Sequence, residues 1–375
     1  MISGSDTDLL MRSCIQKVAT GPEFSKDLPF DEAHAAMRHI LEGKSDPVQA
    51  AVLLIALRMK RETDAENAGV LQAILDTMNP VTADVDELID VADPYDGYTR
   101  GLPMSPFLPA VFAACGVPAV THGLEAVGPK YGVTHRKVLR AAGVEVDLSP
   151  QQAAARITDP AIGWGYVDQK HSAPRLHDLI PLRTRMVKRP VLTTVETLTG
   201  PVRGAARTHL MTGYVHKAYP PVYAQLARHA GFASAAIIRG VEGGVIPSLK
   251  QPALVFCYHD GGAKYPQEVH PGMIGIVQQT RAVPLPQDNA PDTIEGSDTA
   301  AFDSAAAAQA AAAAGLSALQ GIPGAARDSL VYGAAIMLHH LHHLRRHATL
   351  EDAAAAVAAV IDSGAALSHF TAARG

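Results

Sequence analysis

The chain has 375 residues, of which 47% are hydrophobic and 18% are charged, and its formal net charge is −5. This length suits two globular domains, and the acidic balance excludes a surface that attracts polyanions everywhere, although it allows a local basic patch. The three cysteines are scattered, as in a reduced cytoplasmic protein. The first residues lack the basic and apolar regions of a leader, and no apolar run reaches the roughly 18 residues of a membrane-spanning helix. We therefore expect a cytoplasmic protein without a membrane segment.

The N-terminal part of the chain shows only helical patterns. Helices are predicted over residues 31–41, 48–60 and 64–78. Asp46 and Pro47 supply a cap and a first-turn proline for the second helix. Thr63 and Glu66 form a capping box at the start of the third.

From about residue 84, short β-rich runs alternate with helical patterns. Strands are predicted over 88–92, 118–121, 235–238 and 253–258. Helices are predicted over 104–115 and near 132–142, 149–157, 220–230, 301–319, 326–346 and 350–362. Such alternation indicates a mostly parallel sheet covered by helices. We therefore predict an α/β protein with an N-terminal helical domain over 1–83, joined by about 172–200, and a large α/β domain over 84–375.

Two unusual stretches lie near the C-terminus. The alanine-rich run 304–314 continues into Leu316 and Leu319, which favours a packed helix over a low-complexity segment. A group of histidines follows at helical spacing: His339, His340, His342, His343 and His347. No cysteine or acidic residue accompanies them, and two arginines add positive charge, so we interpret them as a solvated helix face and predict no metal site.

The stretch 91–100, VADPYDGYTR, lies between a predicted strand and a predicted helix. Backbone N–H groups converge at such a turn, which makes it a natural place to hold a phosphate. Close approach to a diphosphate requires several glycines, and this loop has only Gly97, between Tyr95 and Tyr98. The phosphate site is therefore either rebuilt or lost.

A second candidate anion site is the segment 128–137, GPKYGVTHRK. Glycines flank a lysine and lead into a predicted helix, whose N-terminus favours an anion. The alternative is an ordinary capped surface helix. The residues that would form the anion site are Lys130, Gly132, Thr134, His135 and Arg136.

Residues 180–217 are strongly basic. They contain seven basic residues against one acid, Glu196, with Tyr214, His216 and Tyr219 near the end. The basic residues are Arg183, Arg185, Lys188, Arg189, Arg203, Arg207 and Lys217. Basic residues beside tyrosines suit a phosphate-bearing partner. The alternative is a hinge whose arginines pair with acids such as Asp93, Asp96 or Asp178.

Four runs, ALRMKRET (56–63), AACGVPAVTHG (113–123), AAGVEVDLSPQQAAARI (141–157) and IDSGAAL (361–367), together resemble the anthranilate phosphoribosyltransferase family. These enzymes belong to the nucleoside phosphorylase-like glycosyltransferases. The resemblance extends over nearly the whole chain. It implies a helical domain hinged to an α/β domain, a substrate cleft between them, and a homodimer formed through the helical domain.

The family motifs are kept unevenly. The lysine–histidine–glycine–asparagine turn reads Thr121-His122-Gly123-Leu124, and only its histidine and glycine match. The glycine-rich loop is replaced around Asp93–Gly97, and the asparagine–x–serine–threonine element keeps only Ser105. Arg183 falls where the family places an arginine near anthranilate. The resemblance and the two loops together give these ligand-binding candidates: Tyr95, Asp96, Gly97, Ser105, His122, Gly123, Lys130, Gly132, Thr134, His135, Arg136 and Arg183.

The acidic pair that holds magnesium in the family falls at Val245-Ile246. Magnesium requires oxygen ligands, which two apolar side chains cannot supply. Magnesium therefore has a place here only if another site exists, for instance around Glu242. These departures resemble a branch of paralogues that keeps the dimeric fold, lacks the phosphoribosyl-diphosphate motifs and, in some members, binds nucleic acid.

Two hypotheses follow, and no catalytic residue is assigned in either. In the first, the protein is a divergent pentosyl- or phosphoribosyltransferase-like protein that binds a phosphorylated small molecule in the interdomain cleft, with little or no anthranilate transfer. In the second, it is a non-catalytic dimer that binds single-stranded nucleic acid through residues 180–217. A continuous basic stripe on the surface favours the second hypothesis, and convergence of these charges inside the cleft favours the first.

Overall fold

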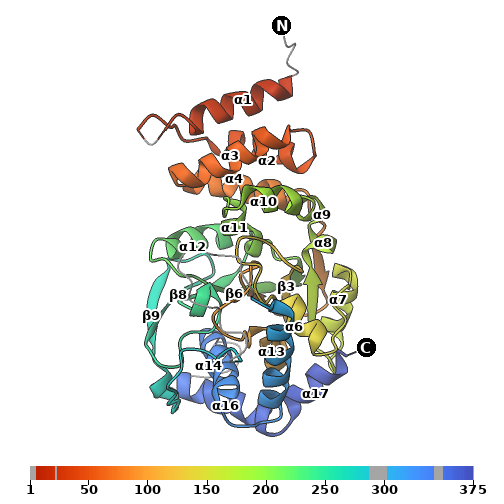
Figure 1. Cartoon of the computed structure of the whole chain (residues 1–375). Helices are drawn as coiled ribbons and strands as arrows, with labels where there is room; N and C mark the ends of the chain where they lie inside the picture. The colour runs from red at the N-terminus through yellow and green to blue at the C-terminus, as the bar shows by residue number, and fades with distance from the viewer. Residues whose placement is uncertain (1–5, 22, 287–301, 342–348, 375) are drawn as a thin grey trace.

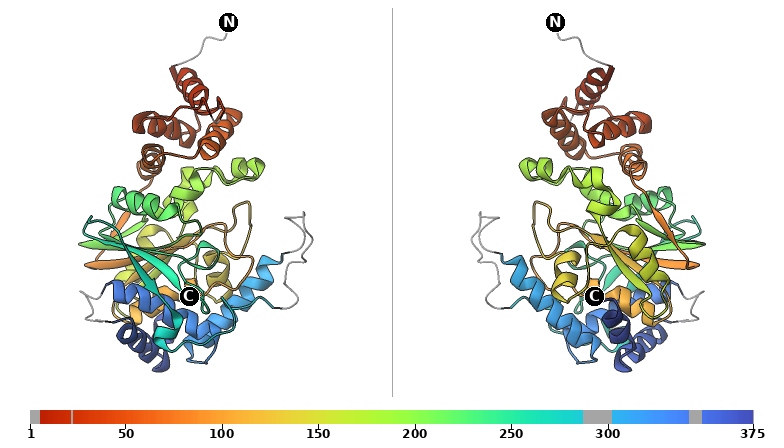
Figure 2. Two further views of the ribbon diagram at one scale, coloured as in Figure 1. Left: turned by 90° about the vertical axis from the view of Figure 1, so that its left-hand side faces the viewer. Right: turned by 90° about the vertical axis from the view of Figure 1, so that its right-hand side faces the viewer.

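The computed structural model describes residues 6–21, 23–286, 302–341 and 349–374. Four helices form a domain at one end of the molecule, packed against the α/β body (Figures 1 and 2). They are α1 (Asp6–Val18), α2 (Phe30–Leu41), α3 (Pro47–Lys60) and α4 (Asp64–Leu75). The predicted caps are confirmed: Asp46 accepts the N–H of Val48 at 2.8 Å, and Thr63 and Glu66 form a reciprocal capping box. The last helix ends at Leu75, three residues earlier than predicted.

The α/β domain is built on a seven-stranded sheet in the order β4-β3-β2-β6-β7-β8-β9. The first five of these strands are parallel, and β8 runs antiparallel to its two neighbours. The strands are β2 (Glu87–Ala92), β3 (Ala119–Gly123), β4 (Trp164–Asp168), β6 (Arg207–Gly213), β7 (Ser234–Ile238), β8 (Ala253–His259) and β9 (Tyr265–Val269). A separate parallel pair joins β1 (Val81–Ala83) and β5 (Val202–Gly204). The mostly parallel sheet is therefore confirmed.

The predicted strands do not include β4, β6 or β9 of this sheet, nor the separate strands β1 and β5. Strand β6 contains Arg207 and His209 and lies in the basic segment. These polar residues interrupt the apolar pattern by which a strand is predicted from sequence. It nevertheless occupies the centre of the sheet, between β2 and β7. Pairing on both sides therefore stabilises this strand more than its own composition does.

Helices cover both faces of the sheet (Figure 1). One core lies between the sheet and α5, α13, α14, α16 and α17, and the other lies between the sheet, α12 and the helical domain. The helices that follow the first four are α5 (Leu108–Ala114), α6 (His135–Ala141), α7 (Pro150–Thr158), α8 (Gln169–Ser172), α9 (Pro174–His177), α10 (Ile180–Met186), α11 (Leu192–Val195), α12 (Tyr219–His229), α13 (Ser304–Leu319), α14 (Ala325–His340), α16 (Leu350–Asp362) and α17 (Ala365–Ala372). The short 3-10 helices are η1 (Ser105–Phe107), η2 (Glu196–Leu198), η3 (Val241–Gly243) and η4 (Pro271–Ile274).

Helices α8 to α11 lie between the helical domain and the sheet (Figure 1). Their apolar side chains share a core with α1 to α4. These side chains are Ala173, Leu176, Val191, Leu192, Val195 and Leu198. The segment predicted to join the helical domain thus contacts it directly.

The alanine-rich run forms α13, with Ala307, Ala308, Ala311 and Ala312 buried, so the packed helix is confirmed. Of the histidine group, His340 is buried in α14, while His342, His343 and His347 lie outside the described residues. In the described ranges, no group of histidine, cysteine and acidic side chains is arranged to hold a metal ion. In the same ranges no single helix is long and apolar enough to cross a membrane, although the bent pair α16–α17 meets that test jointly.

Candidate functional site

Polar side chains gather where the parallel strands end. Asp93 follows β2, His122 and Gly123 end β3, and Asp168 ends β4. The carboxyl ends of parallel strands lie at one edge of a sheet, and α/β proteins bind their ligands there. This edge is therefore the candidate site, and its contacts form two clusters, centred on Asp93 and on His122.

The Asp93 cluster is a buried carboxylate that accepts four hydrogen bonds. Its Oδ2 atom accepts from the Tyr98 hydroxyl at 2.8 Å, from Ser105 Oγ at 2.7 Å and from His135 Nε2 at 2.8 Å. Its Oδ1 atom accepts from the backbone N–H of Val245 at 3.0 Å. Burial alone would raise the pKa of Asp93, but His135 and the hydroxyl donors together lower it below its ordinary value. The carboxylate is thus ionised, with its bonding capacity used inside the protein.

Both ring nitrogens of His135 have buried partners. Its Nδ1 lies 2.7 Å from the Thr121 hydroxyl, which is also 2.9 Å from the carbonyl oxygen of Val91. Its Nε2 lies 2.8 Å from Asp93 Oδ2 and 2.9 Å from Ser105 Oγ. His135 and Asp93 therefore form a buried pair whose members are fixed from both sides.

The His122 cluster is a chain of three side chains, Tyr95, His122 and Asp90. His122 Nδ1 lies 2.6 Å from the Tyr95 hydroxyl, and His122 Nε2 lies 2.8 Å from Asp90 Oδ1. Burial and the nearby acids Glu196, Asp90 and Asp168 raise the pKa of Tyr95 well above its ordinary value. Tyr95 therefore keeps its proton, and the three side chains form one buried hydrogen-bonded chain.

Tyr98 fills the space beside the loop after β2. A Cβ atom on Gly244 would lie 1.6 Å from the Tyr98 hydroxyl, so the ring packs against bare backbone. Gly97 has a φ of +74°, and a Cβ on either Gly97 or Gly132 would meet backbone atoms within 2.8 Å. These two predicted phosphate-binding glycines thus allow their loops to pack on each other, with Tyr98 bridged to Val133.

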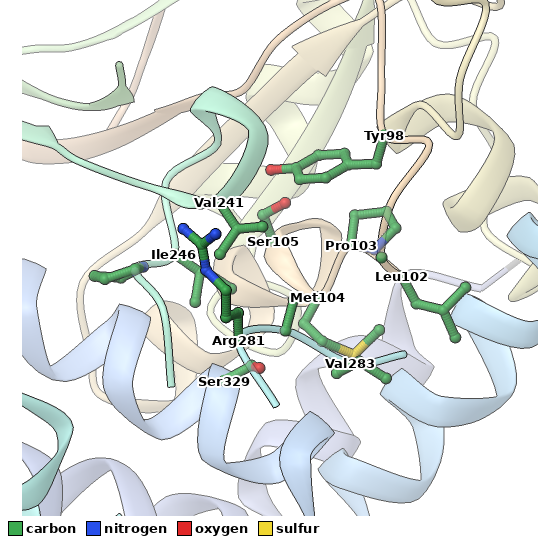
Figure 3. A pocket seen from close by; sticks show the side chains of 13 residues that line it. Tyr98, Leu102, Pro103, Met104, Ser105, Val241, Ile246, Arg281, Val283 and Ser329 are labelled. Carbon is green, nitrogen blue, oxygen red and sulfur yellow. The ribbon is translucent and has the colours of Figure 1, made fainter. Parts of the chain in front are cut away.

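A small pocket remains on the far side of Tyr98 (Figure 3). Tyr98 borders one side and Arg281 another, and apolar residues that include Ile246 and Val283 line the rest. Its volume is about 20 Å³, which is room for about one water molecule. In this conformation the pocket is too small for a diphosphate.

The segment before α6 is held by internal contacts. Thr134 caps α6 through the N–H of Lys137, and Lys130 Nζ donates to the Gly97 carbonyl at 3.0 Å and to Glu242 at 3.2 Å. Arg136 is buried and forms ion pairs with three acids, Glu125, Asp147 and Asp168. Lys130 and Arg136, the lysine and arginine of the predicted anion site, are thus already paired with carboxylates of the protein.

Most arginines of the basic segment are also paired or buried. Arg183 is 3% exposed and forms a two-bond ion pair with Glu196 at 2.6 and 2.7 Å. Burial opposes the charge of Arg183, but Glu196 raises its pKa above the ordinary value. The other paired side chains are Arg189 with Asp96, Arg207 with Asp260, and Arg203 with the carbonyls of Thr199, Gly200 and Ala230.

Three cations of this segment remain exposed: Arg185, Lys188 and Lys217. None forms an ion pair with a residue that the structure describes. The segment is therefore neither a continuous basic stripe nor a set of charges converging on a cleft. The pairing of Arg189 with Asp96 matches the alternative of a hinge held by internal acids.

The residues present do not fit a magnesium ion. Val245 is fully buried and contributes only its N–H to the site, and Ile246 lines the small pocket. Asp93 accepts four hydrogen bonds, and Glu242 accepts from Thr99, Arg100 and Lys130. The carboxylates of Asp93 and Glu242 are thus already occupied by internal donors, which leaves neither of them free to hold the ion.

The sequence indicates the basic and hydroxyl members of this edge but not which acid each of them contacts. Asp90, Asp93, Glu196 and Glu242 each hold one of the predicted residues. A signal was present, because DVAD places two acids within and just after an apolar strand. Buried acids are rarely tolerated without a partner.

The chain is similar over most of its length to known glycosyltransferases. A family model described as "Glycosyl transferase family, helical bundle domain" matches residues 12–78, and "Glycosyl transferase family, a/b domain" matches residues 102–367. The anthranilate phosphoribosyltransferase of Rhodopseudomonas palustris (strain BisB18) is 30% identical over 355 residues, covering 95% of this chain and 94% of that protein. The chain belongs to the anthranilate phosphoribosyltransferase-like glycosyltransferase family.

Other members of the comparison agree on the fold. An uncharacterized protein of Aquifex aeolicus (strain VF5) is 31% identical over 248 residues, which are 66% of this chain and 74% of that protein. The anthranilate phosphoribosyltransferase of Saccharomyces cerevisiae, solved in complex with PRPP and Mg, superposes with a TM-score of 0.74 over 98% of this chain and 97% of that one. The two are 16% identical, so this likeness concerns the fold.

Proposed function

We propose that this protein is a divergent member of the family that binds a phosphate-bearing ligand on the interdomain side of its sheet. We propose further that it does not transfer a phosphoribosyl group to anthranilate. The Asp93 cluster carries this proposal. It places an ionised carboxylate, a tyrosine ring and a buried Val245 where a magnesium-bound diphosphate would need glycines and acids.

Two observations support binding of a phosphate-bearing ligand. The yeast relative of the same fold is solved in complex with PRPP and Mg. In this chain, Lys130 and the backbone N–H groups of Thr99 and Arg100 surround the carboxylate of Glu242, and these donors also suit a phosphate.

A non-catalytic nucleic-acid-binding protein is the second candidate. Its specific support is the set of exposed cations Arg185, Lys188 and Lys217, with His216 and Tyr219 beside the last of them. Rings next to cations suit single strands, because bases stack on rings while cations hold the phosphates.

A homodimer is also part of the proposal. Val48, Val52 and Met59 project from one side of α3 at helical spacing and are 70, 41 and 77% exposed. An exposed apolar stripe of this kind is typical of an interface. We propose that the helical domains of two copies meet there.

Two measurements test the function. A steady-state assay with Mg²⁺, anthranilate and phosphoribosyl diphosphate is expected to show no turnover, whereas turnover within tenfold of the usual range of about 1–10³ per second would contradict the proposal. A binding screen then compares phosphoribosyl diphosphate, nucleotides, single-stranded DNA and single-stranded RNA. Binding of the small molecules favours the first candidate.

For the nucleic-acid candidate, the matched variants are R185A/K188A/K217A and R38A/R140A/R327A, which remove equal charge from different surfaces. Binding that is lost only in the first variant, with a salt slope flattened by about 0.7 per lost phosphate contact, favours nucleic acid. Equal binding by both variants and the parent excludes this surface.

A further inference from the structure

We infer that Glu242 is a built-in occupant of an anion site and that a phosphate group of the ligand binds there by displacing it. This inference rests on the proposed binding of a phosphate-bearing ligand. It adds the position of the phosphate group and the part of the protein that must move to admit it.

The donors around Glu242 form a complete cradle. Oε1 accepts from the N–H of Arg100 at 2.8 Å, and Oε2 accepts from the N–H of Thr99 at 3.1 Å and from Lys130 Nζ at 3.2 Å. The Thr99 hydroxyl completes the set at 3.4 Å from Oε2. Two consecutive backbone N–H groups, a hydroxyl and an ammonium are the donors with which loops hold phosphate.

A phosphate suits this cradle better than a carboxylate. The cradle offers the Lys130 ammonium, two backbone N–H groups and the Thr99 hydroxyl. Asp93, on the other side of Tyr98, already accepts from Tyr98, Ser105 and His135. A phosphate has three acceptor oxygens and nearly two negative charges, so it can use these donors more fully than the two oxygens and single charge of Glu242.

The backbone allows Glu242 to leave. Glu242 has φ 55° and ψ 16°, a left-handed conformation that a residue with a Cβ adopts at a cost. The next residue, Gly243, also has a positive φ of 87°. The base of the loop is fixed by the pairing of Gly240 with Pro247 and by the bond from the Val241 N–H to the Ile246 carbonyl at 3.0 Å. The tip that carries Glu242 can therefore turn outward while the base stays paired.

The test compares binding of inorganic phosphate to the full-length parent and to two variants by isothermal titration calorimetry. E242Q keeps the size of the side chain and removes its charge, and E242G removes the side chain with a residue suited to positive φ. The matched control is E32Q, which removes one equal charge from the helical domain, where Glu32 pairs with Lys17 at 2.6 Å. We expect both Glu242 variants to bind phosphate at least tenfold more tightly than the parent and E32Q.

The double variant E242G/K130A then tests the cradle itself, and it should lose most of that gain. If neither E242Q nor E242G binds phosphate more tightly than the parent, the inference is wrong, even where the parent binds a ligand of the screen. If the variants gain phosphate binding through Lys130 while the parent binds no phosphate-bearing ligand, the inference holds and the proposed function fails. Should E242Q not fold, E242G decides between these results.

Discussion

His135 and Asp93 form a buried pair that joins three segments of the chain. Asp93 follows β2, His135 begins α6, and the N–H of Val245 brings in the loop after β7. The same Asp93 oxygen also holds Tyr98 and Ser105. Removal of the carboxylate would leave the His135 ring and two hydroxyls in the interior without their acceptor, so losing Asp93 costs more stability than the contacts themselves provide.

We predict that D93N destabilises the protein by about 3–5 kcal/mol at pH 7. The pKa of Asp93 is lower in the folded chain than in the unfolded one. Its stabilisation is therefore fully present above the unfolded value, about pH 4, and is lost as the pH falls through the lower folded value. Urea unfolding of the parent and D93N should thus give a difference at pH 7 that narrows near pH 3.

The control for this prediction is D362N, which removes an exposed carboxylate that pairs with Arg327. Exposed pairs of this kind contribute about 0–1 kcal/mol. Equal losses of stability in D93N and D362N at pH 7 would show that the buried pair has no special role.

The caps show how far local sequence determines the elements. Asp46-Pro47 and Thr63 with Glu66 fix the starts of α3 and α4 through neighbouring residues only, and both were predictable. Strand β6 depends on β2 and β7, which are distant in sequence, so its polar composition was misleading. The packing of Tyr98 on Gly244 is likewise a contact between distant loops, and no local pattern indicates it.

The contact between Tyr98 and Gly244 joins two loops and can be tested by substitution. A methyl group on Gly244 would overlap the Tyr98 hydroxyl, so G244A should destabilise the protein by about 1–3 kcal/mol. In a Y98A background the same change should cost less, because the overlapping group is gone. Thermal unfolding of the four proteins in this cycle measures the coupling.

The matched control is G123A at the same sheet edge, because a Cβ there would lie 3.6 Å from the Tyr166 hydroxyl, an ordinary contact. G123A should therefore cost less than G244A. A cost of G244A that is unchanged by Y98A would mean that the overlap is not the cause.

For the whole molecule, the fold was predictable and the state of the site was not. The alternation of strands and helices and the resemblance both indicated the helical domain and the mostly parallel sheet. The sequence predicts that the cations among the candidate site residues face a ligand. In the structure Lys130, Arg136 and Arg183 face internal acids instead, and such pairings depend on tertiary contacts between distant segments.

We predict that two copies of the protein form a dimer through the exposed side of α3. Two copies that meet through Val48, Val52 and Met59 would bury apolar side chains worth about 1.5–3 kcal/mol each. V52E/M59E would place unpaired charges in that interface and should weaken the dimer at least a hundredfold, as measured by light scattering after gel filtration. V277E/M273E is the control, because those two side chains are 82 and 48% exposed on the α/β domain and should not affect the dimer. Two results would exclude this side of α3 as the interface. One is a parent protein that is monomeric at about 50 μM, a concentration well above typical dimer dissociation constants. The other is a V52E/M59E variant that stays as dimeric as the control.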